Sequence, residues 1–207
     1  MKEEIIMIYE ACVGSYQEAI EAAKRGASRI ELCANLLEGG TTPSYGTIIK
    51  TRRDVRLPIM VMIRPRGGNF CFNEDEVEIM IEDIKQCKEI GVDGVVIGAL
   101  KENEIDVKTI KTLVEIAKPL SMTFHMAFDE LTDPFKGIDI LKGLGINRIL
   151  TTGKNENALK GKELIKEFIE YANNEIIIMP GKGITTKNRE ELIGFLQINE
   201  VHGTKIV

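Results

Sequence analysis

Gly91-Val92-Asp93-Gly94-Val95-Val96-Ile97 carries the pattern that decides the fold. A glycine at the end of a helix is followed by an apolar residue, two turn or polar residues, and a short apolar strand. Residues 26–32 and 145–150 repeat this pattern. Glycine suits the first position because the residue after a helix commonly adopts a left-handed conformation, in which a Cβ is penalised. The repeat therefore predicts helices that each lead into a short buried strand.

Helix signals precede the three copies, and further strands lie between them. Ser15 with Glu18 forms a capping box, Asn73 is a good N-cap, and Asp133 with Pro134 supplies a cap and an N1 proline. Additional strands are predicted near residues 5–10, 59–64, 121–125, 176–179 and 200–202, and additional helices over 43–54, 107–117, 157–172 and 187–196.

Strict alternation of strands and helices predicts a parallel sheet covered by helices. Eight such units indicate an α/β chain that forms one (β/α)8 TIM barrel over residues 1–207. A doubly wound open sheet is the alternative, because the pattern alone separates the two poorly. Only residues 203–207 follow the eighth strand, so the barrel lacks a full final helix. We expect a homo-oligomer whose interface covers the outer face of the first and last strands.

Composition excludes several classes of protein. Hydrophobic residues make up 43% and charged residues 29% of the 207 positions, as expected for a globular protein with a real core. A net charge of −5 without a Lys/Arg block argues against nucleic acids or membranes as partners. No signal peptide is recognisable, and no apolar stretch reaches the ~20 residues of a membrane span. The cysteines lack CxxC spacing and are expected to be free thiols in the cytoplasm: Cys12, Cys33, Cys71 and Cys87.

Period-two alternation predicts which side chains enter the barrel. In the strand at 59–64 the β-branched residues face the helices, and Arg64 therefore points inward. The same reasoning brings a set of polar residues together at the carboxyl ends of the strands, where barrel enzymes keep their chemistry. This set comprises Glu10, Glu31, Arg64, His125 and His202. We expect Glu31 to be hydrogen-bonded to Arg64, either as part of a site or as a buried structural ion pair.

Two arginines and two glycines follow the third strand as Arg64-Pro65-Arg66-Gly67-Gly68. Forked guanidinium donors beside a flexible backbone suit a carboxylate or a phosphate. Gly181 and Gly183, after the seventh strand, could add a phosphate cup made of backbone N–H groups. The sequence thus predicts an anionic small-molecule ligand, and the alternative is that the arginines close a loop through salt bridges.

A catalytic interpretation uses the residues at the predicted mouth. Arg64 would hold the anion, and His125 with Glu10 or Glu31 would carry out general acid–base chemistry. The catalytic candidates are Glu10, Glu31, Arg64, His125, Asp129 and His202. Asp129 has the alternative role of capping a turn.

Two cysteines suggest a different chemistry. Cys12 and Cys33 each fall just past a strand end, and the two strands are neighbours. Two thiolates at close range suit Cu(I) or zinc, and their sulfurs are then expected within about 4 Å of each other. Nearby Arg64 is expected to lower the thiol pKa values. Free buried thiols are the alternative.

Several segments resemble the CutC copper-homeostasis family, and the resemblance spans essentially the whole chain. They are residues 10–13 (EACV), 29–33 (RIELC), 38–44 (EGGTTPS), 62–68 (MIRPRGG), 93–98 (DGVVIG) and 123–125 (TFH). The resemblance implies a cytoplasmic, oligomeric barrel that handles Cu(I), with Cys12 and Cys33 as the matching thiols and no organic cofactor. Two functions stay open: binding and buffering of Cu(I), or an enzyme that acts on an anionic or phosphorylated metabolite.

Overall fold

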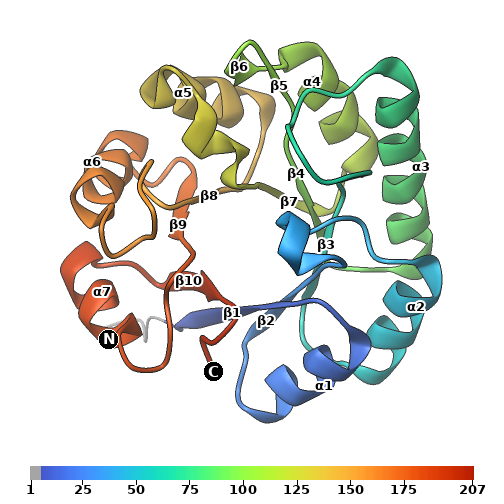
Figure 1. Cartoon of the computed structure of the whole chain (residues 1–207), viewed down its shortest axis with the longest axis horizontal. Coiled ribbons are helices and arrows are strands. Elements are labelled where there is room, and N and C mark those ends of the chain that lie inside the picture. The colour runs from blue at the N-terminus through green and yellow to red at the C-terminus, as the bar shows by residue number, and fades with distance from the viewer. Residues whose placement is uncertain (1–5) are drawn as a thin grey trace.

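The computed structural model describes residues 6–207, and its centre is a nearly closed barrel of parallel strands (Figure 1). The strands are β1 (Ile8–Val13), β2 (Arg29–Leu32), β3 (Ile59–Met62), β4 (Gly94–Ile97), β7 (Ser121–Phe124), β8 (Arg148–Thr151), β9 (Ile177–Pro180) and β10 (Glu200–Gly203). They are ordered β10-β1-β2-β3-β4-β7-β8-β9, and every hydrogen-bonded pair in this order is parallel. The (β/α)8-type barrel is confirmed. An open doubly wound sheet is excluded, because β10 and β9, the strands at the two ends of this order, lie next to each other.

Seven α-helices surround the barrel in the described part of the chain. They are α1 (Tyr16–Lys24), α2 (Tyr45–Asp54), α3 (Glu74–Ile90), α4 (Val107–Ala117), α5 (Pro134–Leu144), α6 (Lys162–Ala172) and α7 (Arg189–Leu196). Two 3-10 helices, η1 (Leu36–Glu38) and η2 (Met126–Glu130), follow β2 and β7, and a hairpin of β5 (Leu100–Lys101) and β6 (Glu104–Ile105) follows β4. None of the described helices is both long and apolar enough to cross a membrane.

Local sequence signals explain where the helices begin and end. Asn73 and Glu76 cap α3 reciprocally, as a capping box does. Gly91 and Gly145 end α3 and α5 at φ values of 77° and 86°, which an L side chain rarely adopts. Ser15 caps α1 as predicted, but the Glu18 carboxylate accepts from the N–H of Gly14.

Some predicted boundaries were wrong. The first strand begins at Ile8 rather than at residue 5, which lies outside the described residues. The helix predicted over 157–172 begins only at Lys162, because residues 153–161 form successive bends and turns. The type and order of the elements are unaffected.

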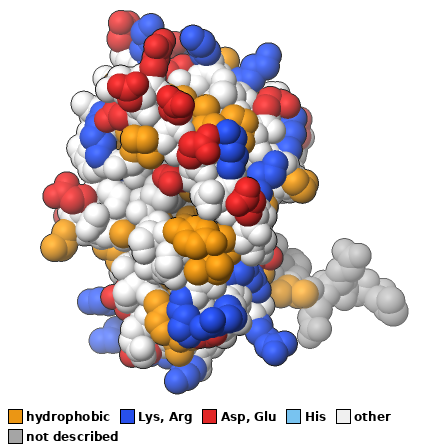
Figure 2. Space-filling model, turned by 90° about the vertical axis from the view of Figure 1, so that its right-hand side faces the viewer, with side chains coloured by type: hydrophobic (Ala, Val, Ile, Leu, Met, Phe, Trp, Pro, Cys, Tyr) orange, Lys and Arg blue, Asp and Glu red, His pale blue; other side chains and the backbone are white. Residues whose placement is uncertain are grey.

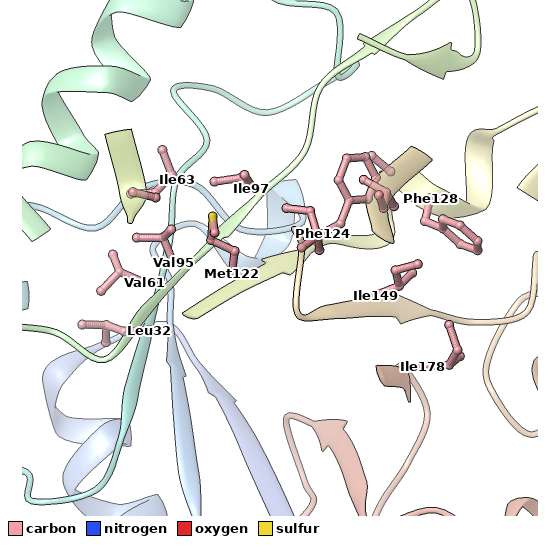
Figure 3. Packing of buried hydrophobic residues seen from close by; sticks show 14 of the residues in the cluster. Leu32, Val61, Ile63, Val95, Ile97, Met122, Phe124, Phe128, Ile149 and Ile178 are labelled. Carbon is pink, nitrogen blue, oxygen red and sulfur yellow. The ribbon is translucent and has the colours of Figure 1, made fainter. Parts of the chain in front are cut away.

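Outward-facing side chains of the strands form the main core against the helices (Figure 3). Val61, Val95 and Phe124 are fully buried there. A second, smaller apolar cluster lies inside the barrel and consists of Cys12, Cys33, Met60, Met62 and Val96. The alternation predicted for the third strand therefore holds: Ile59, Val61 and Ile63 face out, and Met60 and Met62 face in.

The outer face of β1 and β10 is covered by the chain itself. Ala11 and Val201 on this face are 3% and 0% exposed, and Ile206 packs into the same core. Arg189 of α7 places its guanidinium 4.0 Å above the ring of Tyr9 and donates to the carbonyl of Ile206. No helix follows β10 in the described residues, as predicted, but the exposed apolar face expected from this is not there.

The side of the molecule that carries α2 and α3 mixes positive and negative side chains (Figure 2). Exposed apolar residues on these helices include Tyr45, Ile49 and Ile79, and apolar side chains occur there in small groups among polar ones. Such scattered groups are usual on protein surfaces.

Buried ion pairs fill the barrel below its mouth. Arg29 bonds both to Glu10 and, at 2.6 Å, to Glu200. Arg148 approaches the same carboxylate of Glu200 at 3.1 Å. All four side chains are buried. Glu10, predicted at the mouth, therefore belongs to this lower layer.

Candidate functional site at the mouth of the barrel

A cavity of about 350 Å³ opens at the carboxyl ends of the strands. Four of the five residues that alternation placed at the mouth line it. Its polar lining includes Cys12, Glu31, Cys33, Arg64, His125 and His202. Glu10 is fully buried beneath it and is not part of the lining.

Cys12 and Cys33 lie on one wall of this cavity. β1 and β2 pair Cys12 with Glu31, and Cys33 follows β2 directly. One carboxylate oxygen of Glu31 and the two sulfurs all lie within 4.8 Å of one another, and all three residues are buried. Cys33 donates a hydrogen bond to Oε2 of Glu31 at 3.5 Å. Glu31 belongs to a second such group with Glu10 and His202.

Both thiols have raised pKa values. The hydrogen bond of Cys12 to Cys33, burial and the charge of Glu31 raise the pKa of Cys12 well above its usual value. The bond from Cys12 lowers the pKa of Cys33, but burial and Glu31 raise it further, to about 11. The expectation that Arg64 would lower these pKa values was wrong, because the adjacent charge is a carboxylate. An incoming metal ion must therefore displace thiol protons.

His202 joins the cysteine wall to the ionic layer below. Its Nδ1 lies 2.8 Å from Oε1 of Glu10, and its Nε2 lies 3.6 Å from Oε2 of Glu31. Burial lowers the pKa of His202, but Glu31 and bonds to Cys12 and Glu10 raise it well above the usual value. Burial raises the pKa of Glu10, yet His202 and Arg29 outweigh it and hold that pKa at about 2. The carboxylates of Glu10 and Glu31 thus favour the imidazolium form of His202.

Arg64 follows the neighbouring strand β3 and lines the same cavity, but it does not bond to Glu31. Its Nη1 donates to the carbonyls of Glu38 and Gly40 at 2.7 and 2.9 Å, and its Nη2 donates to that of Gly68 at 2.6 Å. The predicted pair with Glu31 was wrong because Glu31 is in register with Met60, four residues before Arg64. The Arg64 side chain therefore reaches the loops above the barrel.

His125 stands beside Arg64 and is held in one orientation. Its Nδ1 accepts from the backbone N–H of Ala127 at 3.2 Å. Burial and the charge of Arg64 lower the pKa of His125 to about 3, so the ring is neutral and carries its proton on Nε2. Gly98 makes room for the ring, because a Cβ at this position would overlap it.

Two residues that were predicted at the site have their bonding partners outside the cavity. Asp129 accepts from the N–H groups of Thr152 and Lys154 at 2.9 and 3.0 Å, so it organises a turn, as its alternative interpretation stated. Arg66 forms an ion pair with Glu76 at 2.5 Å, which closes its loop. Neither lines the cavity.

The four predicted glycines have mainly structural surroundings. Gly67 packs against Glu38, and Gly68 has a φ of +79° and offers its carbonyl to Arg64. Gly181 packs against Leu150, Met126 and His202. Of the four, only Gly183 lines the cavity.

Sequence reasoning missed residues of two kinds. Phe70 lies in a loop without periodicity, yet its ring contacts Arg64 at 4.7 Å and His125 at 4.8 Å. Nothing in the sequence marks this position. Arg29 and Arg148 point into the barrel, and Arg29 shares its face with Glu31, so the same alternation could have found it.

Comparisons with known proteins agree on one family. The sequence profile of the CutC family matches residues 7–207. A mouse protein named copper homeostasis protein cutC homolog is 45% identical over 196 residues, which cover 94% of this chain and 72% of the relative. A CutC family protein of Enterococcus faecalis is 44% identical over 97% of this chain and 100% of its own length. The crystal structure of CutC from Streptococcus agalactiae superimposes with a TM-score of 0.93 at 40% identity, over 98% of this chain and all of that one.

Proposed function

The chain belongs to the CutC family, and on that premise we propose that it serves copper homeostasis by binding Cu(I) through Cys12 and Cys33. The names of its relatives supply the link to copper. The observation that carries the proposal is the cluster of two buried sulfurs and one Glu31 oxygen within 4.8 Å of one another. Thiolates are soft ligands of the kind that Cu(I) prefers.

The charges around the cluster suit this cargo. Binding of Cu(I) to two thiolates gives a complex with one negative charge, and the thiol protons leave. The imidazolium of His202, which is hydrogen-bonded to Cys12, offsets that negative charge. The guanidinium of Arg64 is held by the loop carbonyls of Glu38, Gly40 and Gly68, and repulsion of the cation by this one charge is weaker than direct contact with two anionic sulfurs.

Competition with a Cu(I) chelator under anaerobic conditions tests the assignment. We expect the wild-type protein to take up Cu(I) tightly, and Cys12→Ser with Cys33→Ser to abolish tight binding while the fold is retained. Cys71→Ser is the matched control, because Cys71 is exposed and outside the cluster. An unchanged Cu(I) affinity in the double variant would falsify the assignment.

The setting of this function is proposed as well. We place the protein in the cytoplasm, where reduced thiols such as Cys12, Cys33 and Cys87 persist. We further propose a homo-oligomer, as the family resemblance implies. Its interface lies away from the outer face of β1 and β10, since one chain already buries that face. Sedimentation velocity at micromolar concentration tests the oligomer, and a monomer contradicts it.

A second candidate function, acid–base catalysis, is supported by one observation. Three residues that line the cavity each have a buried polar atom without a hydrogen-bond partner: Oε1 of Glu31, Nε of Arg64 and Nε2 of His125. The roles differ from those expected from the sequence. Glu10 is held by Arg29 and His202, and the free nitrogen of His125 is a donor, so Glu31 is the group left to accept a proton.

Deuterium exchange tests this candidate without knowledge of the product. If Glu31 removes a proton next to a carbonyl, and Arg64 and His125 donate to the carbonyl oxygen, then deuterium enters that position from D2O. Pyruvate and dihydroxyacetone phosphate serve as probes. Exchange that is catalysed by the wild-type protein and lost in Glu31→Gln supports catalysis, and exchange at the uncatalysed rate with both probes argues against it.

A further inference from the structure

Arg64 is a buried cation that has no carboxylate partner among the described residues. Its side chain belongs to a residue only 4% exposed, and its three hydrogen bonds all go to backbone carbonyls. Its Nε is buried and donates to nothing. A buried charge without a counter-charge is costly, and proteins rarely keep one without a use. The charges of Glu38 and Glu130 act on Arg64 only from beyond ion-pair distance, so no anion of the described chain contacts it in the cavity wall.

His125 presents a second buried donor without an acceptor. Its Nδ1 is occupied by the N–H of Ala127, so the remaining N–H, on Nε2, is free to donate. The ring of Phe70 contacts both groups: it lies 4.7 Å from the guanidinium of Arg64 and 4.8 Å from the His125 ring. One aromatic ring thus fixes both donors, and all three residues line the same cavity.

We propose that Nε of Arg64 and Nε2 of His125 form an oxyanion-binding subsite for a small organic anion that enters the barrel mouth. A carboxylate or a phosphate group accepts from both donors and supplies the missing negative charge. The cavity of about 350 Å³ is at the small end of ligand sites, which run from about 300 to 1,000 Å³, so the ligand is a small metabolite.

The far end of the same ligand can be inferred from Glu31, which also lines the cavity. Oε1 of Glu31 is buried, lines the cavity through its residue, and has no donor. A ligand that carries a hydroxyl or amino group away from its anionic group would satisfy Glu31 and both donors at once. The ligand class is therefore a small hydroxy or amino compound with one carboxylate or phosphate.

Arg66 shows that the lack of a carboxylate partner is not a general property of arginines in this loop. Arg66 has a carboxylate partner, Glu76, and additional bonds to the carbonyls of Asn69 and Cys71. It closes the loop and does not line the cavity. Arg64 uses its η nitrogens for the loop and leaves Nε for a ligand. The subsite needs neither cysteine, so it stands apart from copper binding.

Side-chain NMR of the wild-type protein tests the contact directly. In ¹⁵N-labelled protein at constant ionic strength, we expect the Arg64 Nε–H and His125 Nε2–H signals to shift saturably with at least one of three probes. The probes are inorganic phosphate, glycolate and 2-phosphoglycolate. Saturation by glycolate alone identifies a carboxylate subsite, and saturation by phosphate and 2-phosphoglycolate identifies a phosphate subsite. Signals that stay unchanged with all three probes at millimolar concentration overturn the proposal.

Substitutions give an independent measurement by calorimetry with the best probe. His125→Phe keeps an aromatic ring and removes the donor, and we expect about tenfold weaker binding, the loss of one good hydrogen bond. Arg66→Gln is the matched control and is expected to bind as the wild-type protein does. Equal affinity in His125→Phe and the wild type contradicts the proposal. If His125→Phe fails to fold, the NMR titration decides. The Cys12→Ser/Cys33→Ser variant is expected to keep anion binding, so failure of the copper assignment is seen separately.

Discussion

Nδ1 of His202, on the last strand, lies 2.8 Å from Oε1 of Glu10, on the first strand. β1 and β10 are in parallel register with these two residues paired, so the contact joins the two ends of the chain inside the barrel. It also joins the ionic floor to the mouth. The connected groups are Arg148, Glu200, Arg29, Glu10, His202 and Glu31. With all three carboxylates ionised, their charges balance when His202 is protonated, which agrees with its raised pKa.

The pKa values of the two histidines are expected to be shifted in opposite directions from the usual value of 6.5. His202 should stay charged well above pH 6.5 because Glu10 and Glu31 face it, and His125 should stay neutral until about pH 3 because it is buried beside Arg64. The chain has only 2 histidines, so ring carbon and nitrogen NMR shifts separate them readily. A common titration near pH 6.5 would show that both assignments are wrong.

Stability should fall in acid, in part through Glu10. Its pKa is about 2 in the folded chain, compared with 4.5 for an unperturbed glutamate. Between these values the unfolded chain binds the proton and the folded chain does not, so the free energy of unfolding decreases as pH falls. The contribution is complete above pH 4.5 and is lost as pH approaches 2.

Protonation of His125 also lowers the free energy of unfolding as pH falls, and it does so at a higher pH than that of Glu10. Its folded pKa of about 3 lies below 6.5, so the unfolded chain gains a proton first as pH falls. Urea unfolding between pH 7 and about pH 2.5 measures the combined slope. Glu10→Gln should flatten only the part of the slope below pH 4.5, and an identical slope in this variant would exclude the role of Glu10.

Removal of Glu200 should destabilise the protein strongly. Its carboxylate bonds to Arg29 at 2.6 Å and to Arg148 at 3.1 Å, and both guanidiniums are buried. Glu200→Gln leaves them with less counter-charge, and loss of one partner in a buried pair typically costs about 3–5 kcal/mol. Chemical denaturation measures the change in the free energy of unfolding.

A matched surface pair provides the control for Glu200. Glu104 bonds to Lys136 at 3.1 Å, with both side chains more than half exposed. Glu104→Gln should change stability by less than about 1 kcal/mol. Equal effects of the two substitutions would mean that burial does not set the strength of the barrel network.

Sequence alternation predicted which side chains enter the barrel but not how high they reach. Glu31, His125 and His202 face inward as expected, since one residue of slippage would have turned them outward. The prediction of a hydrogen bond between Glu31 and Arg64 was wrong because alternation carries no information on position along the barrel axis. The register places Glu31 beside Met60.

The roles of residues outside the strands were harder to predict, for a related reason. Asp129 and Phe70 lie outside the strands, where no period relates position to direction. Asp129 was predicted either as a catalytic group or as a turn residue, and its actual partners are N–H groups and threonine hydroxyls of residues 151–154. Phe70 has no polar atom to attract attention, although it contacts both proposed anion donors. Such roles depend on tertiary contacts alone.

Cu(I) uptake should release close to two protons per bound ion near neutral pH. The pKa of Cys33 is about 11 and that of Cys12 is well above its usual value, so both sulfurs carry protons before the metal arrives. Both must leave when thiolates bind Cu(I), and the apparent affinity should therefore rise with pH. Calorimetry of Cu(I) transfer in buffers of different ionisation enthalpy counts these protons. Substitution Glu31→Gln should lower the pKa of both thiols, because the Glu31 carboxylate raises them. An affinity that is independent of pH would show that Cu(I) does not bind through these two thiols.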